Sequence, residues 1–344
     1  MGSQADKADL QEASRRIALV DAPSNLGLRP PEDGSVPGCY KAPGALRDRR
    51  LRERLGAEEA GVVVPPRYRA EWWPGYGIRN REAIAQYSVS LARRVGRLLD
   101  EDALPLVLGG DCSILIGNAL ALADRGRFGL AFIDGHSDFR HLGNSEAVGA
   151  AAGEDLAIVT GRGGDLSFLG AHKGYIRDED AIVLGIRGDD EYLGELQALG
   201  IRSESAPGIR GQSERVATEV LEWINKSGVQ GFWIHLDVDA LDRSIMPAVD
   251  TPEPDGLGWT DLVGLLTPLV SSPLAVGMEV TSSIPISIPT DRSLPHSPIN
   301  WWPRSSHDRP QLRDYDLGMR VRKTRLSSDH QVRVRSASGA RAAT

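Results

Sequence analysis

One short segment, Asp134-Gly-His136-Ser-Asp138, has the residue types and the spacing of a metal site. It directly follows the apolar run GLAFI, which is typical of a buried strand. Because side chains two residues apart in an extended chain share a face, the two carboxylates and the imidazole can point into one site. Carboxylates with a single imidazole suit divalent ions such as Mn²⁺. The segment therefore predicts metal binding, and a polar junction between a strand and a loop is the alternative that it leaves open.

Two further polar clusters follow apolar runs elsewhere in the chain. Asp237-Val-Asp239 comes after GFWIHL, with Asp242 three residues further on, and Gly109-Gly110-Asp111 comes after LPLVL. Acidic and imidazole groups at several strand ends are costly to bury without a cation. A carboxylate also has two oxygens with which to bridge a metal pair. Together the clusters favour a site with two divalent ions.

The chain before residue 282 alternates short β-rich runs with helical patterns, and these elements must position the clusters. The clearest helix carries one apolar stripe at steps of three and four: Ile84, Tyr87, Leu91, Val95 and Leu98. Two more helices are expected within 213–224 and 260–269. Continuous apolar strands between helices indicate a parallel sheet covered on both faces, with ligands at the carboxyl ends of the strands. We therefore predict a single α/β domain.

The composition argues against several classes of protein. With 344 residues, 41% of them hydrophobic and 25% charged, the chain can bury a large core. The formal net charge of −7 offers no general attraction for nucleic acid or an anionic membrane. The charged N-terminal segment, and the lack of an apolar run of about 18 residues, argue against a signal peptide and a membrane span. Cys39 and Cys112 are too few for a disulfide scaffold, so we expect a soluble, cytoplasmic protein.

The three clusters together resemble the metal-ligand motifs of the arginase/agmatinase family, the ureohydrolases. The family motifs GGDHS, DAHxDxx and DxDxxDP appear here, in the same order, as GGDCS from Gly109, DGHSDFR from Asp134 and DVDALDR from Asp237. The similarity extends over roughly residues 17 to 281 and includes GMEVT, which contains Glu279. It implies a parallel eight-stranded sheet with helices on both faces, an arginase/deacetylase-like fold. The independent pattern of strands and helices agrees with that fold.

The resemblance also implies a dimanganese centre with six ligands. Five of the ligand positions carry the usual residues: Asp134, His136, Asp138, Asp237 and Asp239. The sixth position is Cys112, where the family usually has His. A thiolate is softer than an imidazole and shifts preference toward Zn²⁺, Fe²⁺ or Co²⁺. The N-hydroxyarginine hydrolases of cycloserine biosynthesis are similar in carrying Cys there, but a buried thiol beside a site that has lost one ligand is the alternative.

The resemblance implies a reaction, in which a metal-bridging hydroxide cleaves a linear guanidino or amidino C–N bond of a small arginine-like compound and urea is released. Asp138 would accept the proton of the hydroxide, and Glu279 would pair with the substrate guanidinium unless it is a solvated strand end. His235 is expected to be a hydrogen-bonded core histidine. The expected partners are the small substrate and, as in the family, copies of the chain in a trimer or hexamer, with no nucleic acid and no membrane.

Departures from the family pattern favour an alternative, a catalytically impaired protein with an incomplete metal site. Arginases carry a proton-shuttling His in a GNLHG-like loop, but residues 145–155 contain none, and His141 is expected to be a solvated loop residue. The loop that binds the ends of arginine is not matched either. Arg140, Asn144 and Ser145 could contact a carboxylate or a polar tail instead. The paired aspartates argue against a deacetylase-like hydrolase with one zinc ion.

The predicted domain organisation is a flexible N-terminus over 1–16, the metal-dependent hydrolase domain over 17–281 and a basic, disordered tail over 282–344. The tail carries eleven Lys or Arg against five Asp and shows no strand or helix period. Read with a shift of one base, codons for Ser282 to Asp291 can encode IFDPDLDPDG, which resembles the family continuation. We therefore hypothesise a frameshift near residue 281 or 282. A genuine basic tail for an acidic partner is the alternative.

Overall fold

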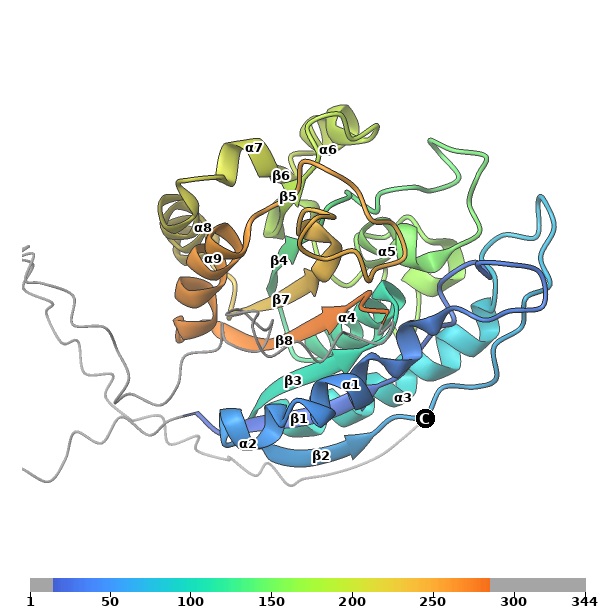
Figure 1. Cartoon of the computed structure of the whole chain (residues 1–344), viewed down its shortest axis with the longest axis horizontal. Coiled ribbons are helices and arrows are strands. Elements are labelled where there is room, and N and C mark those ends of the chain that lie inside the picture. Colours follow the sequence, from blue (N-terminus) through green and yellow to red (C-terminus); the bar gives the residue numbers. More distant parts are fainter. Residues whose placement is uncertain (1–14, 285–344) are drawn as a thin grey trace, which may run out of the picture. The chain divides into compact units, whose positions relative to one another are not determined.

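The computed structural model describes residues 15–284. The predictions for residues 1–14 and 285–344, including the disordered tail and the frameshift, lie outside the described residues. The described chain belongs to one compact unit. Its strands form one sheet in the order β2-β1-β3-β8-β7-β4-β5-β6, in which every neighbouring pair is parallel (Figure 1). The strands are β1 Ile17–Ala22, β2 Glu58–Val62, β3 Leu104–Gly109, β4 Gly129–Ile133, β5 Ala181–Ile186, β6 Arg202–Ser205, β7 Phe232–Asp237 and β8 Ala275–Thr281.

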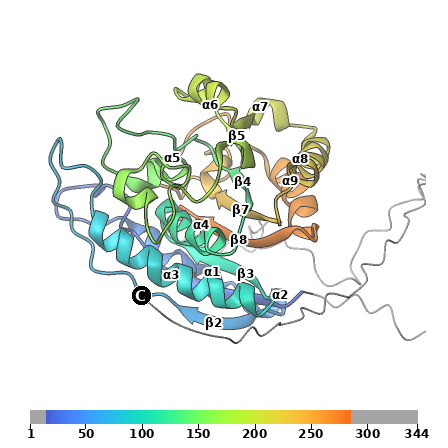
Figure 2. The same ribbon diagram turned by 180° about the vertical axis from the view of Figure 1, so that it is seen from behind.

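Helices cover both faces of the sheet, as Figures 1 and 2 show from opposite sides. One face packs against α3, α4, α5 and α6, and the other packs against α2, α7, α8 and α9. The helices are α1 Ala42–Asp48, α2 Leu51–Leu55, α3 Arg81–Asp100, α4 Leu115–Ala123, α5 Asp155–Val159, α6 Leu193–Leu199, α7 Ala206–Ile209, α8 Ser213–Ser227 and α9 Trp259–Ser271. The predicted fold class, a parallel eight-stranded sheet with helices on both faces, is confirmed.

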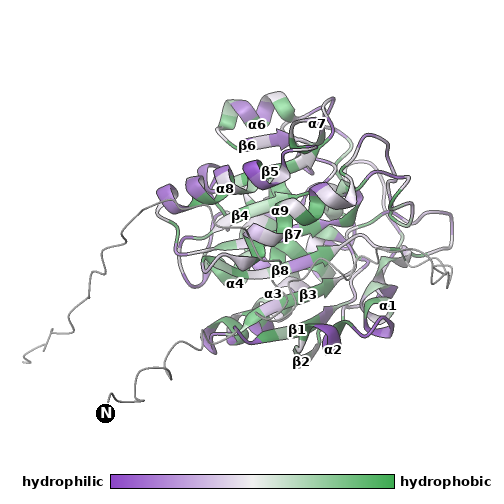
Figure 3. Cartoon of the chain, turned by 60° about the vertical axis from the view of Figure 1, so that its left-hand side comes forward, coloured by the Kyte–Doolittle hydropathy of each residue, from purple (hydrophilic) through white to green (hydrophobic). Residues whose placement is uncertain are grey.

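The predicted apolar stripe of α3 forms part of the core. All five of its residues are buried, and they pack with α4 against the sheet. The stripes expected for α8 and α9 are buried against the opposite face. Figure 3 shows the result, with hydrophobic strands in the middle and hydrophilic outer surfaces on the helices. None of the helices within 15–284 combines the length and the apolar character needed to cross a membrane.

The sheet brings the three predicted polar clusters to one edge. The clusters follow β3, β4 and β7, and because these strands are parallel their carboxyl ends point the same way. The register pairs Ile133 of β4 with Leu236 of β7, so Asp134 and Asp237 come at equivalent positions on neighbouring strands. Between β3 and β7 lies β8, whose Thr281 is in register with Asp237. The order and the register of the strands therefore bring the three polar clusters close together.

The chain remains packed against the domain after β8. Ser282, which the sequence analysis assigned to the tail, is 6% exposed, and its backbone N–H donates to Gly110 O at 2.8 Å. Ile284 N donates to Ala248 O, and the Ile284 side chain packs in a small apolar cluster with Cys39 and Cys112. Residues 282–284 therefore belong to the folded domain and contribute to the site edge.

Candidate metal centre

A pocket of about 600 Å³ opens at the carboxyl ends of the central strands. Five of the six predicted ligands line it: Cys112, His136, Asp138, Asp237 and Asp239. Asp134 is fully buried beside them, with its carboxylate within 4.8 Å of ligand atoms from four of the five. The structure thus brings all six predicted positions to one place.

The first ligand group consists of Asp134, His136 and Asp239. His136 Nδ1 lies 3.1 Å from Asp239 Oδ2 and 3.6 Å from Asp134 Oδ1. Backbone N–H groups hold both carboxylates, because His136 N donates to Asp134 Oδ1 and Gly135 N donates to Asp239 Oδ1. Ligands about 2.0–2.6 Å from one ion lie at most roughly 5 Å apart. The spacing of this group therefore fits a metal ion.

The second ligand group consists of Cys112, Asp134 and Asp138, whose ligand atoms also lie within 4.8 Å of one another. Cys112 begins a short 3₁₀ turn shortly after β3. The link between them requires Gly110, because a Cβ there would overlap Ser24 O. Asp138 adopts a left-handed conformation with φ 45°, which costs about 1–3 kcal/mol in a residue other than glycine. The carboxylate of Asp138 lines the pocket.

The Cys112 thiol is tied to the end of β7 and to the residues after β8. Its Sγ lies 2.7 Å from Asp237 Oδ2, 3.2 Å from Thr281 Oγ1 and 3.0 Å from Ser282 Oγ. The Ser282 hydroxyl also donates to Asp237 Oδ2, at 2.5 Å. The thiol is therefore within ligand distance of the carboxylate cluster.

Glu279 lies below the pocket and is fully buried, so it is not the solvated strand end that the sequence left open. Its Oε1 accepts a hydrogen bond from His235 Nδ1 at 2.8 Å, and its Oε2 accepts one from the Asn118 amide. It does not line the pocket. A substrate cation can therefore reach this carboxylate only by displacing one of the two donors.

The loop after Asp138 differs in part from its prediction. The His141 side chain is only 13% exposed, and its Nε2 lies 2.9 Å from Glu195 Oε1, so it is not a solvated loop residue. Of the three residues expected to contact a polar tail, Arg140 lines the pocket, whereas Asn144 and Ser145 do not. Asn144 instead donates to Glu195 Oε2 and to Phe139 O.

A third group of possible ligands was missed by the sequence analysis. Cys112, Asp155 and His235 bring one sulfur, one oxygen and one nitrogen within 4.8 Å of one another, and all three residues are buried. Two signals in the sequence pointed toward this group. His235 alternates onto the same face as Asp237, and Asp155 stands just after the glycine- and alanine-rich stretch 149–153.

The carboxylates of the centre are electrostatically crowded. Burial raises the pKa of Asp138 and Asp237 well above the usual range, and the Asp134 carboxylate adds repulsion to both. Burial also opposes ionisation of Asp134, but the imidazoles of His136 and His235, 3.6 and 3.7 Å from its two oxygens, lower its pKa to about 2. A divalent cation would relieve this repulsion, which makes the donor set suitable for metal ions.

Comparison with known proteins identifies relatives of similar size. The family model described as "Arginase family" matches residues 16–293. The arginase of Bacillus caldovelox is 29% identical over 284 residues, covering 78% of this chain and 91% of that protein. Its solved structure has a TM-score of 0.72 at 27% identity and covers 79% of this chain and 92% of that one.

The structure of Bacillus subtilis arginase, at 25% identity and the same coverage, has a TM-score of 0.69. Proclavaminate amidino hydrolase from Streptomyces clavuligerus, 20% identical with a TM-score of 0.59 over 79% of this chain and 84% of that one, shares the fold.

Proposed function

The chain belongs to the arginase family, and on that premise we propose that it is a metal-dependent hydrolase of a linear guanidino or amidino C–N bond. The proposed substrate is a small arginine-like compound from which urea is released. The observation that supports this proposal most directly is the convergence of all six ligand positions on one pocket. The comparison covers most of the length of the relatives that are named arginase, so the resemblance is not confined to a fragment of them.

The residues of the pocket fit a pair of divalent ions. Asp134 Oδ2 is buried and has no hydrogen-bond partner within residues 15–284, which leaves it free to bind a cation. One ion would be held by the group Asp134, His136 and Asp239, and the other by Cys112, Asp138 and Asp237, with Asp134 close to both. We expect Mn²⁺, with Zn²⁺, Fe²⁺ or Co²⁺ favoured to the extent that Cys112 is a ligand. When bound, the ions would supply Lewis acidity that makes water available as a nucleophile near neutral pH.

Two carboxylates of the chain would handle the proton and the substrate. Asp138 lines the pocket, where it can accept a proton from the attacking water and pass it to the leaving amine. Glu279 would pair with the substrate guanidinium by exchanging the Asn118 amide for substrate N–H groups while keeping its bond to His235.

The rim of the pocket would attract and orient a cationic compound. Acidic side chains predominate there: Asp189, Asp190, Glu191, Asp250 and Glu253. They would draw in a guanidinium ion and raise its local concentration. Arg140 is a cationic residue that also lines the pocket, and it could bind a carboxylate at the far end of the same molecule.

The proposal is tested by urea release. The Mn²⁺-loaded full chain would be incubated with arginine, N-hydroxyarginine, agmatine, guanidinobutyrate and guanidinopropionate, with metal-stripped protein as the blank. We expect urea from at least one compound, and only with metal. A chain that retains its metal and yet releases urea from none of them contradicts the proposed substrate class.

One observation favours a second candidate, a family member with an incomplete metal site and impaired catalysis. Where arginases carry the shuttle histidine, the pocket wall is formed by Ala150, Ala152 and Gly153. Among residues 15–284, no imidazole lies on that wall to relay a proton, and Cys112 replaces the usual histidine ligand. Metal content separates the two candidates, because retention of less than about half an ion per chain supports the incomplete site.

A further inference from the structure

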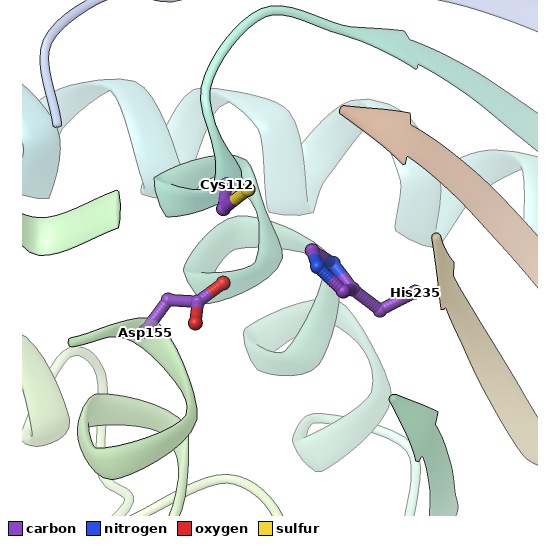
Figure 4. Close-up of side chains that lie close together, drawn as sticks. All are labelled: Cys112, Asp155 and His235. Atoms are coloured by element: carbon purple, nitrogen blue, oxygen red, sulfur yellow. The ribbon is translucent and has the colours of Figure 1, made fainter. Parts of the chain in front are cut away.

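Asp155 and His235 lie next to the pocket and take no direct part in the proposed reaction. Asp155 is the first residue of α5, and His235 lies in β7 two residues before Asp237. Both are fully buried. Figure 4 shows their side chains directed toward each other and toward Cys112, from three separate segments of the chain.

The polar atoms of these two side chains lack partners. Neither Asp155 oxygen, nor His235 Nε2, has a hydrogen-bond partner within residues 15–284. A buried carboxylate without a hydrogen bond or a counter-charge is rare because desolvation opposes it strongly. A thiol sulfur and an imidazole nitrogen lie within 4.8 Å of an Asp155 oxygen, and both are groups that bind metal ions. A cation between the three side chains would satisfy all of them at once.

The imidazole of His235 is held in the orientation that a metal ligand needs. His235 Nδ1 is 2.8 Å from Glu279 Oε1, and the other Glu279 oxygen is held by the Asn118 amide. If Nδ1 carries the proton and donates it to Glu279, Nε2 keeps its lone pair for the side facing Asp155 and Cys112. The ring also stacks on Phe132, with centroids 4.4 Å apart and planes at 9°. A carboxylate behind a ligating histidine is the usual outer support of a metal site.

We propose that Asp155 and His235 draw the Cys112-bound ion of the proposed pair to an inner position next to the pocket, where Cys112, Asp155 and His235 hold it and prefer Zn²⁺, Fe²⁺ or Co²⁺ over Mn²⁺. One sulfur, one nitrogen and one oxygen donor form a set that suits these borderline ions. Asp134 Oδ2, 3.7 Å from His235 Nε2 and also unpartnered within the described chain, is the nearest further ligand. The inner position adds Asp155 and His235 to the six predicted ligands and does not depend on which compound is hydrolysed.

The test is a Co²⁺ titration of the metal-stripped full chain, because a thiolate bound to Co²⁺ gives a charge-transfer absorption band. We expect the wild type to show this band and D155N and H235Q to lose it, with one Co²⁺ fewer per chain and at least tenfold weaker Co²⁺ binding. E279Q, which removes only the outer support, should weaken binding about 10–100-fold. In competition, Zn²⁺ should displace Co²⁺ from the wild type and Mn²⁺ should not.

Three matched variants make the result specific. C39S and H172Q change the other buried cysteine and a histidine that pairs with Asp124 at the surface, so both should keep the band. D239N disrupts the group around His136 and should lose an ion but keep the band. D155N replaces a carboxyl group that makes no hydrogen bond within the described chain, so it remains informative if H235Q does not fold.

The proposal is overturned if the wild type shows no thiolate band, or if D155N and H235Q keep both the band and the wild-type stoichiometry. Displacement of Co²⁺ by Mn²⁺ as readily as by Zn²⁺ would overturn the stated preference. Urea release is a separate readout. If no compound is hydrolysed while the band behaves as expected, the proposed function fails and the inner site stands.

Discussion

Cys112 and Asp237 are in direct contact, with Sγ 2.7 Å from Oδ2, although they follow strands that are not neighbours in the sheet. The contact spans β8 and joins the first and third ligand motifs. Burial raises the pKa of the Cys112 thiol, so in the metal-free protein the thiol keeps its proton and donates it to Asp237. A metal ion that binds both residues must displace this proton, because the thiolate is the ligating form.

Removing the carboxylate of Asp237 should abolish urea release and remove at least one metal ion. Asp237 also accepts hydrogen bonds from the Cys112 thiol and the Ser282 hydroxyl, so a water molecule cannot take its place as a ligand. D237N is the variant of choice, since it keeps the shape of the side chain. Metal analysis and a urea assay check the result. D242N is the matched control, because Asp242 accepts from Ser244 and does not line the pocket, and it should keep its metal. Full activity in D237N would contradict the metal centre.

Replacing Cys112 by His should restore the usual family ligand and shift metal preference toward Mn²⁺. The new ring is larger than the thiol and enters a position that is only 2% exposed, so we expect destabilisation of about 1–3 kcal/mol in the metal-free protein. Metal competition and thermal unfolding measure the two effects. C112S, which is similar in size to Cys, is the control for the loss of sulfur. Unchanged metal preference in both variants would identify Cys112 as a bystander.

The stability of the metal-free protein should fall as pH rises above about 4, the ordinary pKa of Asp. Burial raises the pKa of Asp155 and Asp237, so above that pH the folded state holds protons that the unfolded state has lost. His235 acts in the same direction, because burial opposes its charge but Asp134 and Glu279 raise its pKa. Its contribution is present below about pH 6.5 and is lost as pH rises through the folded-state value.

A bound divalent ion should remove this loss, since it replaces the protons as counter-charge. The measurement is the melting temperature with a chelator and with Zn²⁺, from about pH 6 to about pH 9. We expect the stabilisation by Zn²⁺ to grow with pH. If the melting temperatures with the chelator and with Zn²⁺ differ by the same amount at every pH, the pKa values of Asp155, Asp237 and His235 are not raised as stated.

The fold and the shared location of the three polar clusters could be predicted because they depend on local patterns, whereas Cys112 was a ligand position only through the resemblance to the family. The apolar runs mark the strands, and residues directly after a run must lie at the carboxyl edge of a parallel sheet. Asp155 could not be placed in this way, since it follows a loop without periodicity and its burial depends on how that loop folds back. The role of His235 depends on the register between β7 and β8, which sets it beside Glu279. Such a register between segments 44 residues apart is not encoded in either segment alone.

The frameshift hypothesis predicts that a corrected chain, continuing after Thr281 as IFDPDLDPDG, is more stable. A mostly apolar cavity of about 50 Å³ lies over β3, β7 and β8, between α2 and α9. A family-like C-terminal segment could cover apolar surface there, and each 100 Å² covered adds about 2.5 kcal/mol. Melting temperature and soluble yield of the two chains test this. Equal stability would mean that the hypothesis has failed and that the basic tail needs its own explanation.

The most direct test of the metal centre is the number of ions that the full chain retains after loading with Mn²⁺ and removal of free metal. The arrangement of Asp134, His136 and Asp239 beside Cys112, Asp138 and Asp237 predicts about two ions per chain. Retention near zero, in protein that is folded by circular dichroism, would contradict the account, because the pocket would then hold its crowded carboxylates without the cations that we propose for them.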